Sequence, residues 1–248
     1  MEKKYKLTEE TINVNGITLY RIEALRDFGD VKKGDKGGYI EKEENLSQNS
    51  NCWVYDDAMV YGNARVYGNA LVCGNASIYG DASIYGDAKV YGNANICGNA
   101  NICGNAEVYN NAIVCGNAWV FGKAKVFGNA EVYNNAIVCD NAKVCGNAMI
   151  YDNAKVFEDT EVCGNVEVCG NAEIRGDAVI TSKSDYIVFK NWWSSGRYFT
   201  WTKNNNMWKV GCFYGTSNEL IEKAYRDSNE SGKEYEKIVK YVESILKA

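Results

Sequence analysis

Residues 92–103 read Gly-Asn-Ala-Asn-Ile-Cys twice in succession. The same six-residue unit, most often Gly-Asn-Ala-x-Val-Tyr, runs from about Ser50 to Thr181. Val or Ile stands at every sixth position from Val54 to Ile180, with no insertion. One hexapeptide cannot bury its own apolar side chains, so a repeat this regular indicates a solenoid whose successive units bury a shared core.

Each unit has a strand part and a turn part. Ala-x-Val-Tyr can form a short strand, and Gly-Asn can form a turn because both residues tolerate positive φ. Alternation along the strand places Ala and Val on one face. The x position is variable, with Arg65, Leu71 and Lys89 among its occupants, and we expect it outside. The predicted core is therefore a narrow stack of small and branched side chains.

The repeat resembles that of left-handed parallel β-helices, in which a small residue precedes an aliphatic residue by two positions. That resemblance implies three hexapeptides per triangular coil, and so about seven coils here. A right-handed helix remains the structural alternative. The expected fold is mainly β: an N-terminal β cap (residues 1–49), a left-handed parallel β-helix (residues 50–181) and a small C-terminal α+β domain (residues 182–248).

The position after each Val is nearly always Tyr, Cys or Phe, and it holds eight of the ten cysteines. Interchange with aromatic residues favours a packed apolar ladder, and a Cys-x5-Cys spacing is not typical of zinc sites. With three hexapeptides per coil, Cys97 lies over Cys115 and Cys145 lies over Cys163, within reach of a disulfide. In a cytosolic chain we expect these thiols to be reduced.

Large apolar side chains at x positions are exceptions to the polar outside of the repeat. Trp119 and Ile137 are neighbours on one expected face, and Ile113 lies around the corner from Trp119. A Trp–Ile pair that faces water indicates a candidate protein interface. The alternative is a set of scattered surface residues, which are common in soluble proteins.

Residues 182–248 are rich in aromatic residues interleaved with basic ones. Such a combination can bind nucleotides by stacking and phosphate pairing. The alternative is a small domain whose aromatic residues form its own core, followed by helices from Ser217 onward. The candidate binding residues are Trp192, Trp193, Arg197, Tyr198, Trp201 and Lys203.

Composition excludes several functions. The formal charge of -5 argues against a surface that coats DNA. The chain has no histidine, and so lacks the commonest general base and metal ligand. No secretion signal or apolar span is evident, so we expect a cytoplasmic protein without membrane contact. We expect no catalytic residue, metal site or cofactor.

The two ends add a second resemblance. Residues 19–25 (LYRIEAL), 31–40 (VKKGDKGGYI), 44–47 (ENLS) and 51–55 (NCWVY) resemble the cap of phage and prophage hexapeptide-repeat proteins. Residues 211–216 (GCFYGT) resemble part of a small domain often attached to such repeats. Members are often labelled hexapeptide transferases or polymer-forming proteins by fold analogy, so the resemblance implies no shared activity.

We therefore expect a non-catalytic binding scaffold of the phage type, in the cytoplasm of a bacterial host. It would sequester or block a host protein, another host macromolecule or a small nucleotide, as in evasion of host immunity. We also expect a homo-oligomer, a dimer or a trimer. One alternative is an acyltransferase of the hexapeptide superfamily, although those enzymes use a histidine base that is missing here. The other is a self-assembling structural protein.

Overall fold

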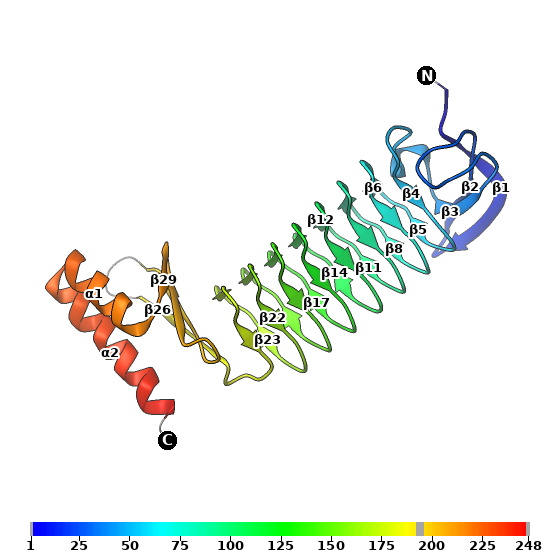
Figure 1. The fold of residues 1–248 in the computed structure, drawn as a ribbon. Coiled ribbons are helices and arrows are strands. Elements are labelled where there is room, and N and C mark those ends of the chain that lie inside the picture. Colours follow the sequence, from blue (N-terminus) through cyan, green and yellow to red (C-terminus); the bar gives the residue numbers. More distant parts are fainter. Residues whose placement is uncertain (1, 192–195, 247–248) are drawn as a thin grey trace.

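The computed structural model describes residues 2–191 and 196–246. The repeat forms a rod-shaped parallel β-solenoid, with a curled antiparallel cap at one end and a small α+β domain at the other (Figure 1). The two chain ends lie at opposite ends of the rod (Figure 1). The predicted mainly β solenoid with a small C-terminal α+β domain is confirmed.

The solenoid has three faces, and each is a sheet in which strands three hexapeptides apart are neighbours. Face 1 contains β3 (Lys36–Ile40), β5 (Met59–Val60), β8 (Ser77–Ile78), β11 (Asn95–Ile96), β14 (Ile113–Val114), β17 (Glu131–Val132), β20 (Met149–Ile150) and β23 (Glu167–Val168). Face 2 contains β4 (Trp53–Val54), β7 (Leu71–Val72), β10 (Lys89–Val90), β13 (Glu107–Val108), β16 (Lys125–Val126), β19 (Lys143–Val144), β22 (Glu161–Val162) and β25 (Val179–Ile180). Face 3 contains β6 (Arg65–Val66), β9 (Ser83–Ile84), β12 (Asn101–Ile102), β15 (Trp119–Val120), β18 (Ile137–Val138), β21 (Lys155–Val156) and β24 (Glu173–Ile174).

The solenoid has about eight turns, one more than the repeat alone predicts. The additional turn begins before residue 50. Strand β3 pairs in parallel with β5, and Leu46 forms a bridge with Val66. These cap residues do not match the hexapeptide pattern, but their backbone continues the same hydrogen-bonded sheet.

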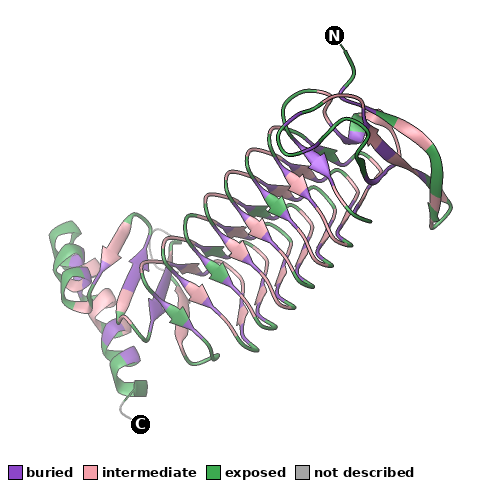
Figure 2. Cartoon of the chain, turned by 45° about the vertical axis from the view of Figure 1, so that its right-hand side comes forward, coloured by how far each residue is buried: buried purple, intermediate pink, exposed green. Residues whose placement is uncertain are grey.

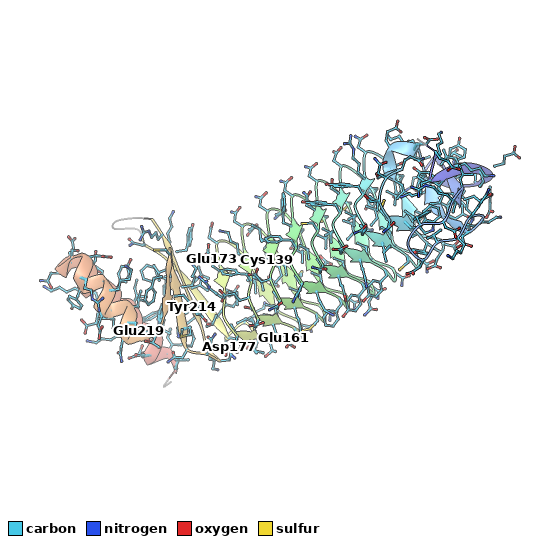
Figure 3. All side chains as sticks on the ribbon, turned by 45° about the horizontal axis from the view of Figure 1, so that its top comes forward. Cys139, Glu161, Glu173, Asp177, Tyr214 and Glu219 are labelled. Atoms are coloured by element: carbon cyan, nitrogen blue, oxygen red, sulfur yellow. A yellow bond between two sulfur atoms is a disulfide. The ribbon has the colours of Figure 1, made fainter. Side chains whose placement is uncertain are left out.

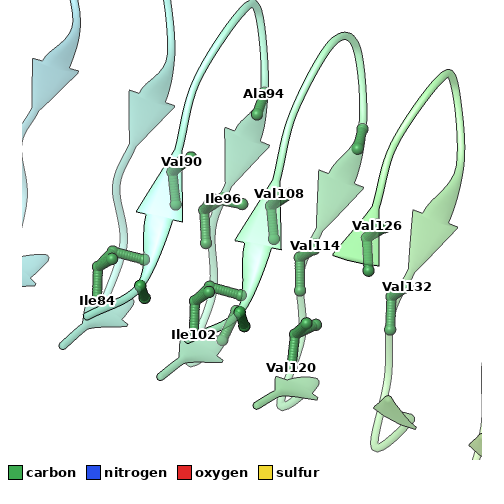
Figure 4. Packing of buried hydrophobic residues seen from close by; sticks show 14 of the residues in the cluster. Ile84, Val90, Ala94, Ile96, Ile102, Val108, Val114, Val120, Val126 and Val132 are labelled. Carbon is green, nitrogen blue, oxygen red and sulfur yellow. The ribbon is translucent and has the colours of Figure 1, made fainter. Parts of the chain in front are cut away.

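The core is the predicted stack of Ala and Val or Ile side chains. From Ala58 to Ala154, every Ala of the repeat is fully buried. Figure 4 shows Val90, Val108 and Val126 in one row along the rod, on successive coils. Buried residues alternate with more exposed ones along the coils (Figure 2). This alternation explains why the x position tolerates charged residues.

The N-terminal cap covers the first turn. Strands β1 (Tyr5–Val14) and β2 (Ile17–Ala24) form an antiparallel hairpin, and β2 pairs with β3. The short 3₁₀ helix η1 (Glu43–Asn45) follows. The buried Lys4 Nζ donates to the carbonyl oxygen of Cys52 over 2.8 Å, which fixes the start of the chain on the first coil.

The C-terminal domain is a four-stranded antiparallel sheet covered by two helices. Its strands are β26 (Tyr186–Lys190), β27 (Tyr198–Thr202), β28 (Met207–Val210) and β29 (Phe213–Gly215). Helix α1 (Ser217–Asp227) is capped by Thr216, whose side chain accepts from the Glu219 N–H, and α2 (Asn229–Leu246) packs beside it. Among the described residues, we find no helix with the length and apolar character to cross a lipid bilayer.

Residues after each Val stack in ladders along the rod. Tyr91 and Tyr109, for example, lie with ring centroids 4.7 Å apart and nearly parallel planes. Cys145 and Cys163 form a disulfide across neighbouring coils, with Cα atoms 4.6 Å apart. The expectation of reduced thiols is therefore wrong for this pair, because stacking brings their Cα atoms within bonding range. Cys97 and Cys115 are free thiols, as expected.

Candidate functional site

A polar cavity lies where face 3 of the last coils meets the C-terminal sheet. Strands β24 and β27 approach each other there, and the Glu173 N–H donates to Thr200 Oγ1 over 3.0 Å. Figure 3 labels Glu173 at this junction. The cavity, of about 220 Å³, is called the junction cavity below. It is lined by Asn153, Lys155, Asn171, Glu173, Arg197, Tyr198, Thr200, Lys209 and Gly211.

Glu173 is the electrostatic centre of the junction cavity. Lys155 Nζ and Lys209 Nζ each lie 3.0 Å from one of its carboxylate oxygens. Burial alone would raise the pKa of Glu173, but the hydrogen bonds from both lysines outweigh it and hold that pKa below its usual value. Lys209 is only 8% exposed, and its ammonium also donates to the carbonyl oxygen of Gly211.

The lining of the junction cavity is positively charged. It holds three cationic side chains, Lys155, Arg197 and Lys209, against the single carboxylate of Glu173. Arg197 is exposed, and its side chain passes over Gly211, where a Cβ would lie 3.0 Å from Arg197 Cδ. The absence of a Cβ at Gly211 thus leaves room for this guanidinium.

A second cavity, of about 520 Å³, adjoins the first and shares Asn171 and Tyr198 with it. Tyr151, Tyr186 and Lys183 surround Glu167, which lines the cavity on the last strand of face 1. Tyr151 donates its hydroxyl proton to Glu167 Oε2 over 3.0 Å, and Lys183 Nζ lies 3.9 Å from Glu167 Oε1. Cys169 also lines this cavity.

The tyrosines around Glu167 are hydrogen-bond donors at neutral pH. Burial, together with the nearby Cys169, raises the pKa of Tyr186 to about 12. Its hydroxyl donates to the backbone carbonyl oxygen of Glu167 over 3.0 Å. Hydrogen bonds to Cys169 and Glu167 likewise raise the pKa of Tyr151. Glu167 is therefore a positioned carboxylate, held by Tyr151 at one oxygen and open to the cavity.

Only part of the sequence-predicted binding set lies at this junction. Arg197 and Tyr198 line the cavities, whereas Trp192 and Trp193 lie outside the described residues. Trp201 is buried in the core of the C-terminal domain and donates its Nε1 proton to Asn206. The prediction that Trp201 stacks on a ligand is therefore wrong, because the sheet side it occupies packs against the helices. Lys203 is exposed beyond the other end of β27.

Several candidate site residues were not predicted from the sequence. Lys155 and Glu173 stand three hexapeptides apart at x positions, so their opposite charges on adjacent coils were a usable signal. Glu167 is a similar x-position residue, but its contacts with Lys183 and Tyr186 depend on how the chain leaves the solenoid. Lys209 lies on a strand of the C-terminal sheet, and it reaches Glu173 only because this sheet packs against the end of the solenoid.

Two of the three predicted interface residues lie on face 3. Trp119 on β15 pairs with Ile137 on β18, whereas Ile113 is half-buried on face 1. Trp119 is 42% exposed and makes a T-shaped contact with Phe121, with ring centroids 6.5 Å apart. The pair lies on the same sheet as Lys155 and Glu173, toward the N-terminal side of the junction cavity.

One cluster of metal-binding residue types occurs among the described residues. Ligand atoms of Cys145, Glu161 and Cys163 lie within 4.8 Å of one another. The disulfide between the two cysteines removes their thiolates, so only the Glu161 carboxylate remains as a ligand. This cluster is not a metal site in its disulfide form.

Comparison with known proteins agrees with the coil geometry. Residues 54–68 and 64–80 match the family described as the YdcK beta solenoid repeat. The chain is a β-solenoid repeat protein. It is also 40% identical over 62 residues to the "Uncharacterized acetyltransferase YdcK" of Escherichia coli (strain K12). The match covers 22% of this chain and 19% of that relative, so the chain spans about a fifth of the curated relative it matches.

This similarity corrects one expectation. The prediction that the chain is not an enzyme is contradicted, because the matching relative carries the name of an acetyltransferase. That prediction rested on the missing histidine. A carboxylate such as Glu167 can accept a proton in its place, so the absence of histidine was too weak a reason to exclude catalysis.

Proposed function

We propose that the chain is an acyltransferase, with its active site in the second cavity beside Glu167. The observation that carries the proposal is the 40% identity over 62 residues with a protein named as an acetyltransferase. The cavities at the junction add a concave site with a few polar side chains, which suits a small acceptor. The proposed reaction moves an acetyl group from a thioester donor, such as acetyl-CoA, to a hydroxyl or amine.

Glu167 is the proposed general base. The acceptor oxygen or nitrogen attacks the thioester carbonyl carbon while its proton passes to Glu167. The carbonyl then re-forms, the carbon–sulfur bond breaks, and the sulfur leaves as a thiolate that takes the proton from Glu167. Lys183, which lies 3.9 Å from Glu167, supplies a positive charge near the developing oxyanion.

Glu167 is preferred over Glu173 for this role. Two lysines hold the pKa of Glu173 below its usual value, which makes it a weaker base and occupies its oxygens. Glu167 instead receives one neutral hydroxyl from Tyr151, and its other oxygen has a single lysine, Lys183, at the longer distance of 3.9 Å. It keeps carboxylate surface toward the larger cavity.

The first test measures acetyl transfer from acetyl-CoA with the full-length chain. Free CoA and acetylated products are followed by mass spectrometry across a panel of small hydroxyl and amine acceptors. We expect turnover with at least one acceptor, and a loss of about 100-fold or more in kcat for Glu167→Gln, since a general base contributes at least that much. Binding of acetyl-CoA, measured by calorimetry, should stay within about twofold because the substitution removes only the base.

The matched control is Glu131→Gln, a substitution in the same column of face 1, two coils from Glu167. It should leave kcat unchanged. The proposal is wrong if the chain neither binds acetyl-CoA nor releases CoA with any acceptor, or if Glu167→Gln retains full turnover.

A further inference from the structure

The junction cavity and the apolar pair beside it form one elongated surface. We propose that this surface binds a nucleotide, with its phosphates in the cavity and its base over Trp119 and Ile137. This surface lies on face 3, beside the proposed acetyl-transfer site at Glu167 on face 1, and is a binding site in its own right. The binding itself does not depend on acetyl transfer.

The positions of four residues on face 3 carry the argument. Trp119 pairs with Ile137, Ile137 with Lys155, and Lys155 with Glu173, on four successive coils. Adjacent strands lie about 4.8 Å apart, so Trp119 stands roughly 10 Å from Lys155 along the rod. A nucleoside diphosphate in an extended conformation has this reach.

The cavity end has the chemistry of a phosphate site. Its excess of positive charge, from Lys155, Lys209 and Arg197 against Glu173, favours an anionic group such as a diphosphate. Lys209 is nine-tenths buried and is held by Glu173 and the Gly211 carbonyl group, so this cation is fixed before a ligand arrives. Asn153, Asn171 and Thr200 add neutral polar groups to the lining.

The other end has the chemistry of a base-stacking site. Trp119 is the most exposed tryptophan among the described residues, and Phe121 holds its ring through the T-shaped contact. The half-buried Ile137 extends the apolar surface toward Lys155. An indole ring can stack on any nucleobase. Stacking requires no hydrogen bonds between the base and this surface.

A small nucleotide fits better than other phosphate compounds. A sugar phosphate has no planar ring for Trp119, and inorganic phosphate would use only the cavity. A nucleic acid strand would meet a chain with a formal charge of -5, which disfavours a long polyanion. The base and its phosphates together use both ends of the surface.

The test uses ADP as the probe, with adenosine and inorganic pyrophosphate as its two halves. Calorimetry on the full-length chain should show ADP binding at least tenfold more tightly than either half. Trp119→Ala should weaken ADP binding roughly tenfold, and Trp119→Phe should restore most of it, because a base stacks on either ring. Lys155→Met should also weaken ADP binding and should reduce its dependence on salt concentration.

Lys89→Met, an exposed lysine in the x column of face 2, is the matched control and should bind ADP as the wild type does. The inference is overturned if ADP binds no better than pyrophosphate, or if Lys89→Met and Lys155→Met weaken binding equally. ADP binding without acetyl transfer would count against the proposed function alone, and transfer without ADP binding against this inference alone.

Discussion

Two constraints favour glycine in the turns of the repeat: a positive φ and a close approach to the backbone of the next coil. Gly98 has a φ of 63°, and a Cβ on it would lie 2.9 Å from the backbone nitrogen of Gly116 on the next coil. Where an acid replaces glycine, its side chain gains a partner. Asp152, with a φ of 58°, accepts the N–H of Gly170 through Oδ2 over 3.2 Å. The repeat therefore allows non-glycine residues in its turns when the side chain caps the following coil.

Gly98 and Gly170 have similar φ values, so a comparison of their alanine variants distinguishes backbone strain from overlap with the next coil. Gly98→Ala and Gly170→Ala should share the left-handed backbone strain of about 1–2 kcal/mol. Only Gly98→Ala adds an overlap with the next coil, since nothing lies within 4 Å of a Cβ at Gly170. We expect Gly98→Ala to reduce the free energy of unfolding by about 1 kcal/mol more, the lower end for an overpacked contact. Urea denaturation of both variants would measure this, and equal losses would contradict the overlap.

Asparagine ladders connect the coils at the scale of the element. Asn99 Nδ2 donates to Asn117 Oδ1 over 2.9 Å, Asn117 donates to Asn135 over 3.1 Å, and Asn135 donates to Asn153 over 3.2 Å. Each inner member both donates and accepts, which requires an amide. The final member, Asn153, lines the junction cavity, so the ladder runs from the middle of the rod to the candidate site.

The ladder predicts different costs for two similar substitutions. Asn99→Ala removes one side-chain bond to the next coil, whereas Asn117→Ala removes two. Each exposed bond contributes about 0.5–1 kcal/mol, so Asn117→Ala should be the more destabilising by that amount. Thermal unfolding followed by circular dichroism would test this order. Equal midpoints for the two variants would mean that water replaces the ladder without loss.

Sequence and structure agree best where the information is local. The Ala and Val periodicity could be predicted because each hexapeptide repeats one burial pattern, from Val54 to Ile180. Strand β3 was missed because its Gly-Gly-Tyr-Ile sequence joins the sheet without matching the hexapeptide. Arg197 and Tyr198 were predicted from composition alone. Composition cannot tell which side of a sheet is covered by helices, so Trp201 was wrongly placed in the site.

At the scale of the whole molecule, polar contacts fasten the C-terminal domain to the rod. Asn204 Oδ1 accepts the Val179 N–H over 2.8 Å, and Tyr214 donates to the Arg175 carbonyl oxygen over 3.2 Å. Figure 3 places Tyr214, Asp177 and Glu173 together at this boundary. Because the candidate site is built from both sides, its shape depends on this docking.

The docking should depend on pH through Glu173. Its pKa is lowered in the folded chain, so the carboxylate stabilises the junction above the ordinary value of about 4.3, and this contribution is lost as the pH falls through the lowered pKa. We expect hydrogen exchange in β27 and β28 to accelerate over that acidic range relative to the intrinsic exchange rate of each amide at the same pH. Glu173→Gln should lose this acceleration, while Glu131→Gln keeps it. An unchanged acid profile in Glu173→Gln would contradict the role of the two lysine contacts.

The uniform register of the coils has a consequence for how such a chain can vary. Every turn adds three hexapeptides in the same pairing, so a whole turn can be inserted or removed without changing the hydrogen-bond pattern of its neighbours. Each such event moves the two ends of the rod apart or together by about 4.8 Å. The cap and the C-terminal domain need not change with it. The length of the rod can therefore change in steps of one coil, independently of the chemistry at its C-terminal end.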